Sequence, residues 1–154
     1  MNIPALDFLV QKCGSYSGEG KNQEGHAFSA KLEMKSRVQA NLVELGFRAE
    51  DSDKAFHEES TWITNDLVTD KLCLWTVSTN TPGMLRHELS EDSGPTEVYE
   101  RRFVFQLGKP EDKRVFRQEI ALELRRDGSV SYRYSWAVPH EVLEQRTQST
   151  LRKI

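Results

Sequence analysis

The sequence predicts an all-β protein, an antiparallel up-and-down β-barrel of about ten strands preceded by one short helix. Runs of alternating apolar and polar residues follow one another along most of the chain, as in strands that bury one face. Turn signals recur about every eight to twelve residues, and no helical periodicity follows the first segment. Short consecutive connections favour a meandering barrel, because a Greek key needs a long connection. We expect residues 1–154 to form a single domain.

The chain opens with a short helix over residues 4–12. Pro4 suits the first helical turn, and Ala5, Phe8 and Leu9 recur at helical spacing. A helix of this length is not stable alone in water. We therefore expect it to dock across one end of the barrel.

Three glycines, Gly14, Gly18 and Gly20, mark the first strand. A phosphate-binding loop would need a lysine followed by serine or threonine, and a buried strand before it. The sequence has neither at this place. Glycine within a strand more often marks a bend or a close backbone approach, and we favour that interpretation.

Alternation predicts the next strands over residues 28–35, 37–49, 54–64, 72–79 and 84–89. The last of these is short, and a polar loop is expected to follow it up to residue 95. The register of the strand over residues 54–64 stays open. A slip of one residue would move His57 from the inner face to the outer one.

The clearest alternation lies between Glu97 and Thr150. In residues 114–126 one face is apolar, and the other is charged and expected to be wet. Asp127-Gly128 then supplies a strong hairpin signal. The next run, residues 129–138, carries large aromatic residues on its inner face. The final run is polar on both faces, so we expect it to line a wet space or to lie at a sheet edge.

The composition narrows the class of protein. Charged residues make up 29% of the chain and the net charge is −3, with the basic residues spread along the sequence, so we expect no nucleic-acid partner. No apolar run approaches the roughly 20 residues of a membrane span. The two cysteines, Cys13 and Cys73, have no paired spacing, and reduced thiols favour a soluble, cytoplasmic protein.

The helix, the glycine-marked strand and the meander that follows together resemble the calycin superfamily, which includes lipocalins and fatty-acid-binding proteins. Within it, Gly14-x-Tyr16-x-Gly18-x-Gly20 is similar to the G-x-W-x-G-x-G motif of the nitrobindin group of bacterial haem-binding barrels and their uncharacterised relatives. Tyr16 stands where that tryptophan would be. The resemblance implies a barrel with an internal cavity, and haem iron with peroxynitrite or nitric oxide chemistry.

The sequence departs from this family pattern at the haem ligand. In nitrobindins a histidine in the region of the closing strand holds the iron, whereas residues 141–154 contain no histidine. His140, beside Pro139, precedes that strand and does not match. We therefore expect no cofactor, with haem kept as an alternative.

Candidate ligand-binding residues follow from strand parity. Tyr132, Tyr134 and Trp136 share one face, where they either line a cavity or simply pack the core. His57 and Glu59 also share one face. If buried, this pair could grip a ligand or transfer a proton, and the alternative is an exposed pair.

Arg146 lies in the closing strand, where fatty-acid-binding proteins place an arginine that grips a carboxylate. A buried guanidinium needs a planar anion, so the residue type fits this role. The tyrosine that usually accompanies that arginine is absent, and the alternative is an arginine that faces solvent.

We therefore predict a binding protein that holds a small apolar or amphipathic molecule inside the barrel. A haem barrel is the first alternative, and a filled barrel that acts as a protein-interaction module is the second. No nucleophile motif and no local set of metal ligands supports catalysis, so we lean against an enzyme. The ligand-binding residues in this prediction are His57, Glu59, Tyr132, Tyr134, Trp136 and Arg146.

Overall fold

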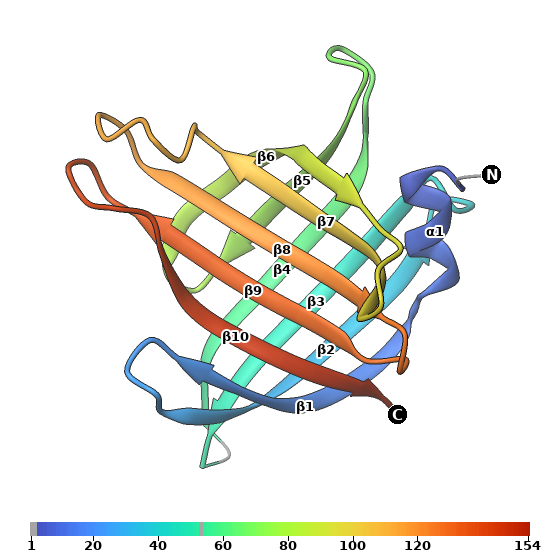
Figure 1. Ribbon diagram of the computed structural model, residues 1–154, viewed down its shortest axis with the longest axis horizontal. Coiled ribbons are helices and arrows are strands. Elements are labelled where there is room, and N and C mark those ends of the chain that lie inside the picture. Colours follow the sequence, from blue (N-terminus) through green and yellow to red (C-terminus); the bar gives the residue numbers. More distant parts are fainter. Residues whose placement is uncertain (1–2, 53) are drawn as a thin grey trace.

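The protein is a closed barrel of ten antiparallel strands (Figure 1). The computed structural model describes residues 3–52 and 54–154. Each strand pairs with its neighbours in the chain, and β1 (Gly14–Asn22) pairs with β10 (Glu144–Lys153) to close the ring. The predicted all-β meander of about ten strands after one short helix is confirmed. Among the described residues, no helix is long and apolar enough to cross a membrane.

The remaining elements overlap the predicted ranges, but the strand predicted over residues 37–49 begins only at Leu42, because residues 38–41 form a turn with positive φ at Val38, Gln39 and Ala40. The helix α1 is Ala5–Gln11. The strands between the first and the last are β2 Ala27–Arg37, β3 Leu42–Asp51, β4 Lys54–Asp66, β5 Lys71–Ser78, β6 Thr81–Ser93, β7 Tyr99–Leu107, β8 Arg117–Arg125 and β9 Val130–Ala137.

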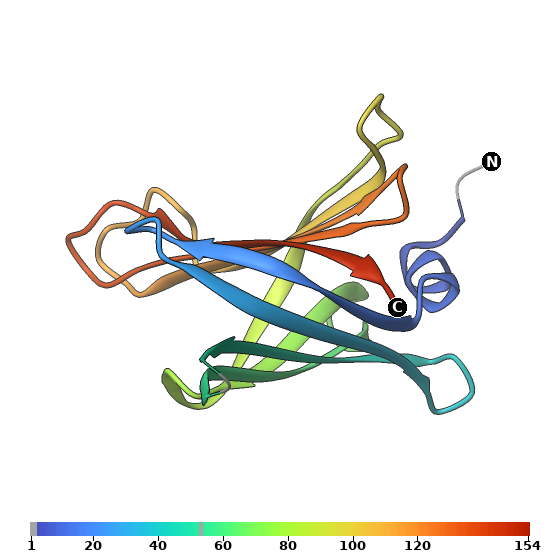
Figure 2. The same ribbon diagram turned by 90° about the horizontal axis from the view of Figure 1, so that it is seen from below.

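The helix α1 packs at one end of the barrel, as expected (Figure 2). Leu6, Phe8 and Leu9 are buried, and the Phe8 ring lies 6.2 Å from that of Phe103. The C-terminus lies at this same end, whereas the β1–β2 and β9–β10 turns lie at the opposite end. The apolar face of α1 therefore covers one mouth of the barrel.

Apolar side chains fill the middle of the barrel. From Ala27 to Lys35 of β2, every second residue is buried and the residues between are exposed, which is the period of a strand with one buried face. The side chains of Leu32, Ile63, Phe105 and Leu122 are almost fully buried. The contiguous core extends from α1 through this layer to the aromatic residues of β9.

The glycines of β1 permit close approach of neighbouring chain segments, as the sequence indicated. A Cβ atom on Gly18 would lie 2.1 Å from the carbonyl oxygen of Thr150, and one on Gly20 would lie 2.5 Å from the Phe28 ring. Both glycines lie opposite β10 in the pairing that closes the barrel. Closure therefore depends on the absence of a side chain at Gly18, where the nearest atom belongs to the backbone of β10.

Two expectations from the sequence need correction. Residues 84–89 are not a short strand, because β6 extends from Thr81 to Ser93 and a register shift between Leu89 and Glu91 interrupts the alternation that marked its end. The last strand does not lie at an edge, because β10 pairs with both β9 and β1.

The outer face of β8 is not uniformly wet, which also corrects the sequence-based expectation. Arg117 is 1% exposed, because the loops before β8 and after β9 cover it. Its guanidinium donates hydrogen bonds to the carbonyl oxygens of Val115, Pro110, Val138 and Glu141. A single side chain thus ties two loops together at the end opposite α1.

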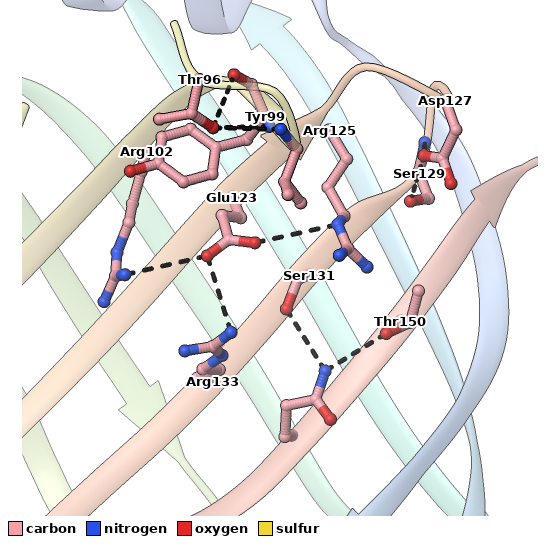
Figure 3. A network of polar contacts seen from close by, with 12 residues as sticks. Thr96, Tyr99, Arg102, Glu123, Arg125, Asp127, Ser129, Ser131, Arg133 and Thr150 are labelled. Carbon is pink, nitrogen blue, oxygen red and sulfur yellow. Dashed lines mark hydrogen bonds and ion pairs between the residues drawn. The ribbon is translucent and has the colours of Figure 1, made fainter. Parts of the chain in front are cut away.

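Glu123, on the same face, is buried by arginines from three strands (Figure 3). Arg102, Arg125 and Arg133 lie 3.9, 3.8 and 3.6 Å from its carboxylate. These separations are too long for direct hydrogen bonds, so the cluster is held by charge attraction. It explains why a charged residue on the outer face is nevertheless buried.

The close contact at Gly18 predicts a large effect of one methyl group. We expect Gly18→Ala to lower the free energy of unfolding by about 2 kcal/mol or more, because its Cβ would overlap the backbone of β10. Gly46→Ala is the matched control, since a Cβ there meets nothing within 4 Å. Its effect should stay within about 0.5 kcal/mol, as measured by urea unfolding. Equal effects of the two substitutions would contradict the closure argument.

The four hydrogen bonds that Arg117 donates to the loops predict a second difference in stability between two variants. Arg117→Met should destabilise the protein by about 3 kcal/mol, because four carbonyl oxygens lose their donor. Arg114→Met removes a neighbouring arginine whose side chain is 87% exposed, so it should cost less than about 0.5 kcal/mol. Thermal and chemical unfolding of both variants would test this, and an Arg117→Met protein as stable as Arg114→Met would refute it.

Candidate ligand-binding site

A small cavity lies at the mouth of the barrel opposite α1. It has a volume of about 70 Å³ and is bordered by Phe28, Phe47, His57, Tyr134 and Trp136, among others. A second hollow of about 240 Å³ adjoins it. Both are bordered by Asn80, Tyr134 and Trp136, so these three side chains separate the two spaces.

Strands β2, β3, β4, β9 and β10 direct side chains toward this cavity. His57 of β4 lies opposite Ala49 of β3, and both are buried. Tyr134 and Trp136 come from β9, where alternation turns both inward. The register of β4, which the sequence left open, therefore places His57 on the inner face.

Arg146 reaches the cavity through an irregularity of β10. The pairing of β10 with β9 shifts between Gln145 and Thr147, and Arg146 is the residue at this bulge. Its guanidinium stacks on Trp136, with the central carbon 4.1 Å from the ring centroid. Nε also donates a hydrogen bond to the Trp136 carbonyl oxygen. The arginine thus forms part of the rim.

The charge of Arg146 is already matched. Nη1 donates to Gln23 Oε1 at 3.0 Å and lies 3.4 Å from a carboxylate oxygen of Glu144. Nη2 lies 3.6 Å from Glu141. With its donors directed to these partners, this arginine has little capacity left to grip a ligand carboxylate.

A buried carboxylate, that of Glu59, lies behind His57 and does not itself line the cavity. The side chain of Glu59 is 1% exposed. The Tyr132 hydroxyl donates to Glu59 Oε2 at 2.5 Å, and His57 Nε2 lies 3.0 Å from Glu59 Oε1. Asn80 Nδ2 lies 2.8 Å from His57 Nδ1. Asn80, His57, Glu59 and Tyr132 therefore form one continuous polar chain.

The contacts within this polar chain indicate which ring nitrogen of His57 carries the hydrogen. A carboxylate accepts hydrogen bonds, so His57 Nε2 carries a hydrogen toward Glu59. In the neutral ring, Nδ1 is then an acceptor that faces the Asn80 amide at the cavity wall. The lone pair of His57 Nδ1 is the polar group that a ligand could reach by displacing Asn80.

The charge of Glu59 acts on the surrounding tyrosines. Burial, followed by the nearby Glu59 charge, raises the pKa of Tyr132 well above its usual value. The same two causes raise the pKa of Tyr134. Both phenols therefore stay protonated, and Tyr132 remains a donor to Glu59. The Tyr132 ring also stacks on Phe47 at 4.9 Å, which holds it in place.

Further polar groups lie deeper in the interior. Gln118 Nε2 donates to the Tyr134 hydroxyl, and Thr61 and Thr76 share a hydrogen bond of 2.9 Å. His87 is fully buried, and neither ring nitrogen has a hydrogen-bond partner among the described residues. Burial is the main reason that the pKa of His87 falls to about 4, while neighbouring Gln118 opposes the fall. His87 is therefore neutral near pH 7.

The structure brings together the residues that sequence parity singled out. His57, Tyr134, Trp136 and Arg146 border the cavity, while Glu59 and Tyr132 lie directly behind His57. Whether they bind a ligand stays a prediction.

Sequence reasoning missed other members of the site. Phe28 and Phe47 lie within the strands predicted over residues 28–35 and 37–49, and Asn80 lies between those predicted over residues 72–79 and 84–89. Nothing in the sequence indicated that Asn80 would reach back to His57. His87 was seen in its strand, but its complete burial was not foreseen.

The residues around the cavity do not fit haem. Both ring nitrogens of His57 are engaged, by Glu59 and by Asn80. His140 is exposed in the turn before β10, and β10 contains no histidine.

Comparison with known proteins identifies the fold and nothing more specific. No family model matches the chain, and no curated protein matches it. Among solved structures, the chain is similar to that of Rv2717c from M. tuberculosis, with a TM-score of 0.71 and 16% sequence identity. The match covers 100% of this chain and 99% of the other. At this identity the similarity supports a shared barrel fold over the whole length.

The buried imidazole predicts a pH dependence of stability. The pKa of His87 is 6.5 in its ordinary state and about 4 in the fold, so the unfolded chain binds more protons between these values. Acidification through this range therefore removes stability. From about pH 7 to about pH 4.5, the parent should lose about 2 kcal/mol more than His87→Leu. Urea unfolding at both pH values measures this difference.

An exposed histidine, His26, provides the control for this measurement. The His26 side chain is 76% exposed, so His26→Gln should lose as much stability on acidification as the parent. If His87→Leu also shows the parent's pH dependence, His87 does not titrate as described.

Proposed function

We propose that this protein binds a small amphipathic molecule at the end of the barrel opposite α1. The observation that carries the proposal is the convergence of aromatic rings and a buried polar chain on one cavity. An apolar wall with few polar groups is the usual composition of a ligand pocket. Core packing alone would not require a buried carboxylate, because an apolar residue there avoids the cost of burying charge.

The two hollows suggest how such a molecule is arranged. The outer one, of about 240 Å³, is bordered by Phe116, Trp136 and Val138 and suits an apolar body. The inner one, of about 70 Å³, ends at His57 and Asn80 and suits one polar group. A ligand that spans both would replace the hydrogen bond between Asn80 and His57.

We also infer a relationship to the calycin barrels, with the nitrobindin group as the relatives that the first strand resembles. The support is the position of the motif residues. Tyr16 is buried and its hydroxyl donates to the Lys12 carbonyl oxygen, which links β1 to the end of α1. Gly18 and Gly20 lie in the closing pair of strands. We do not extend the inference to haem chemistry, because the cavity does not fit that group.

The proposal predicts binding that is lost when the cavity is filled. We expect ligand-observed NMR to detect binding of small phenyl-bearing molecules to the full chain. Native mass spectrometry of the purified protein would report any molecule that is retained from the cell. Ala49→Phe adds a ring within the cavity wall and should weaken this binding at least about tenfold.

The control places the same ring elsewhere. Ala27 lies on the exposed face of β2, so Ala27→Phe should bind as the parent does. Circular dichroism would establish that both variants are folded. The proposal is wrong if no probe binds, or if Ala49→Phe folds and binds as tightly as Ala27→Phe.

A further inference from the structure

The polar end of the cavity offers acceptors and negative charge, and this restricts the ligand. Glu59 is buried, and its partners among the described residues are the Tyr132 hydroxyl and the His57 ring. The lone pair of His57 Nδ1 is oriented toward the cavity wall by this same pairing. A ligand group that replaces Asn80 at His57 must therefore donate a hydrogen bond.

The field of Glu59 extends to the cavity wall. After burial, the Glu59 charge is the next cause of the raised pKa of Tyr134, which borders both hollows. Charges interact more strongly in a poorly solvated interior than in water. The charge of Glu59 would therefore attract a positive ligand group beside His57 and repel a negative one.

The rim does not reverse this preference. Arg146 borders the cavity, but its guanidinium faces the carboxylates of Glu141 and Glu144 and stacks on Trp136. These two carboxylates outnumber the one guanidinium that they surround. An incoming carboxylate would have to displace existing partners of Arg146 while it approached the field of Glu59.

The walls favour a cation for a separate reason. Phe28 and Phe56 meet edge to face at 5.5 Å, and both border the cavity. The faces of aromatic rings attract positive charge, and organic ammonium groups are held in cages of this kind. Aromatic walls and a buried carboxylate therefore act in the same direction.

We propose that the cavity selects small organic amines in their protonated form, with an ammonium N–H donated to His57 Nδ1 and an apolar body in the outer hollow. This inference rests on the proposed function, because it names the ligand class of the same site. It differs from the carboxylate ligand that an arginine in the closing strand first indicated.

A series of three probes that share one skeleton tests the charge preference. The probes are 2-phenylethylamine, 2-phenylethanol and phenylacetate, each titrated into the full chain by calorimetry. We expect the amine to bind at least about tenfold more tightly than the alcohol, and phenylacetate to bind most weakly. In Glu59→Gln the amine should lose most of its advantage over the alcohol, because the attracting charge is gone.

The neighbouring residue supplies the matched control. Glu58 lies in the same strand, one residue before Glu59, but its side chain is 58% exposed and pairs with Arg48. Glu58→Gln removes the same charge from the outer face and should leave the ratio of the amine and alcohol affinities unchanged. Should Glu59→Gln fail to fold, Asn80→Ala serves instead. It frees His57 Nδ1 without touching Glu59 and should tighten amine binding about threefold or more.

The outcomes separate this inference from the proposed function. If the alcohol or phenylacetate binds as tightly as the amine, and Ala49→Phe abolishes that binding, the site exists but the amine preference is wrong. If Glu58→Gln and Glu59→Gln change the ratio equally, the preference does not come from the buried carboxylate. If none of the three probes binds, the proposed function fails as well.

Discussion

The pairing of β1 with β10 is the constraint on which the rest of the barrel depends. It joins the first and last strands of the chain, so every strand has two partners and no edge is left open. The close approach at Gly18 makes this pairing possible, since any side chain there would meet the backbone of β10. Closure also defines an inside, and only then do the inward residues of β4 and β9 meet across the interior.

That interior contains a charge that the fold must stabilise. An isolated buried carboxylate is very costly, and Glu59 is tolerated because Tyr132 and His57 direct donors at both of its oxygens. Because Nε2 of His57 faces Glu59, Nδ1 is the ring nitrogen that faces the cavity. The contacts that reduce the cost of burying Glu59 therefore also orient His57 Nδ1 as a hydrogen-bond acceptor. Stability and a candidate binding function are linked through His57.

Much of this fold could be predicted from the sequence, because strand alternation is local. The parity of residues 129–138 correctly placed Tyr132 and Tyr134 inside, and Asp127-Gly128 forms the expected turn, with Gly128 at φ 85°. What failed depends on parts of the chain that are distant in sequence. Loops bury Arg117, three arginines bury Glu123, and bulges change parity in β6 and at Arg146. Alternation also cannot distinguish a residue that packs the core from one that borders a cavity, as at Phe28 and Phe47.

The two ends of the barrel differ in chemistry. At the α1 end, apolar residues such as Leu9 and Phe8 pack directly on the core. Apolar side chains therefore cover this mouth, as they fill the interior. At the other end, the layer above the core is aromatic and polar, and the rim includes the ion pairs of Arg146. A barrel that served only as a packed scaffold would gain stability from apolar residues at both ends. The retention of Glu59, His57 and Asn80 at one end is the feature that favours a binding role over a filled scaffold.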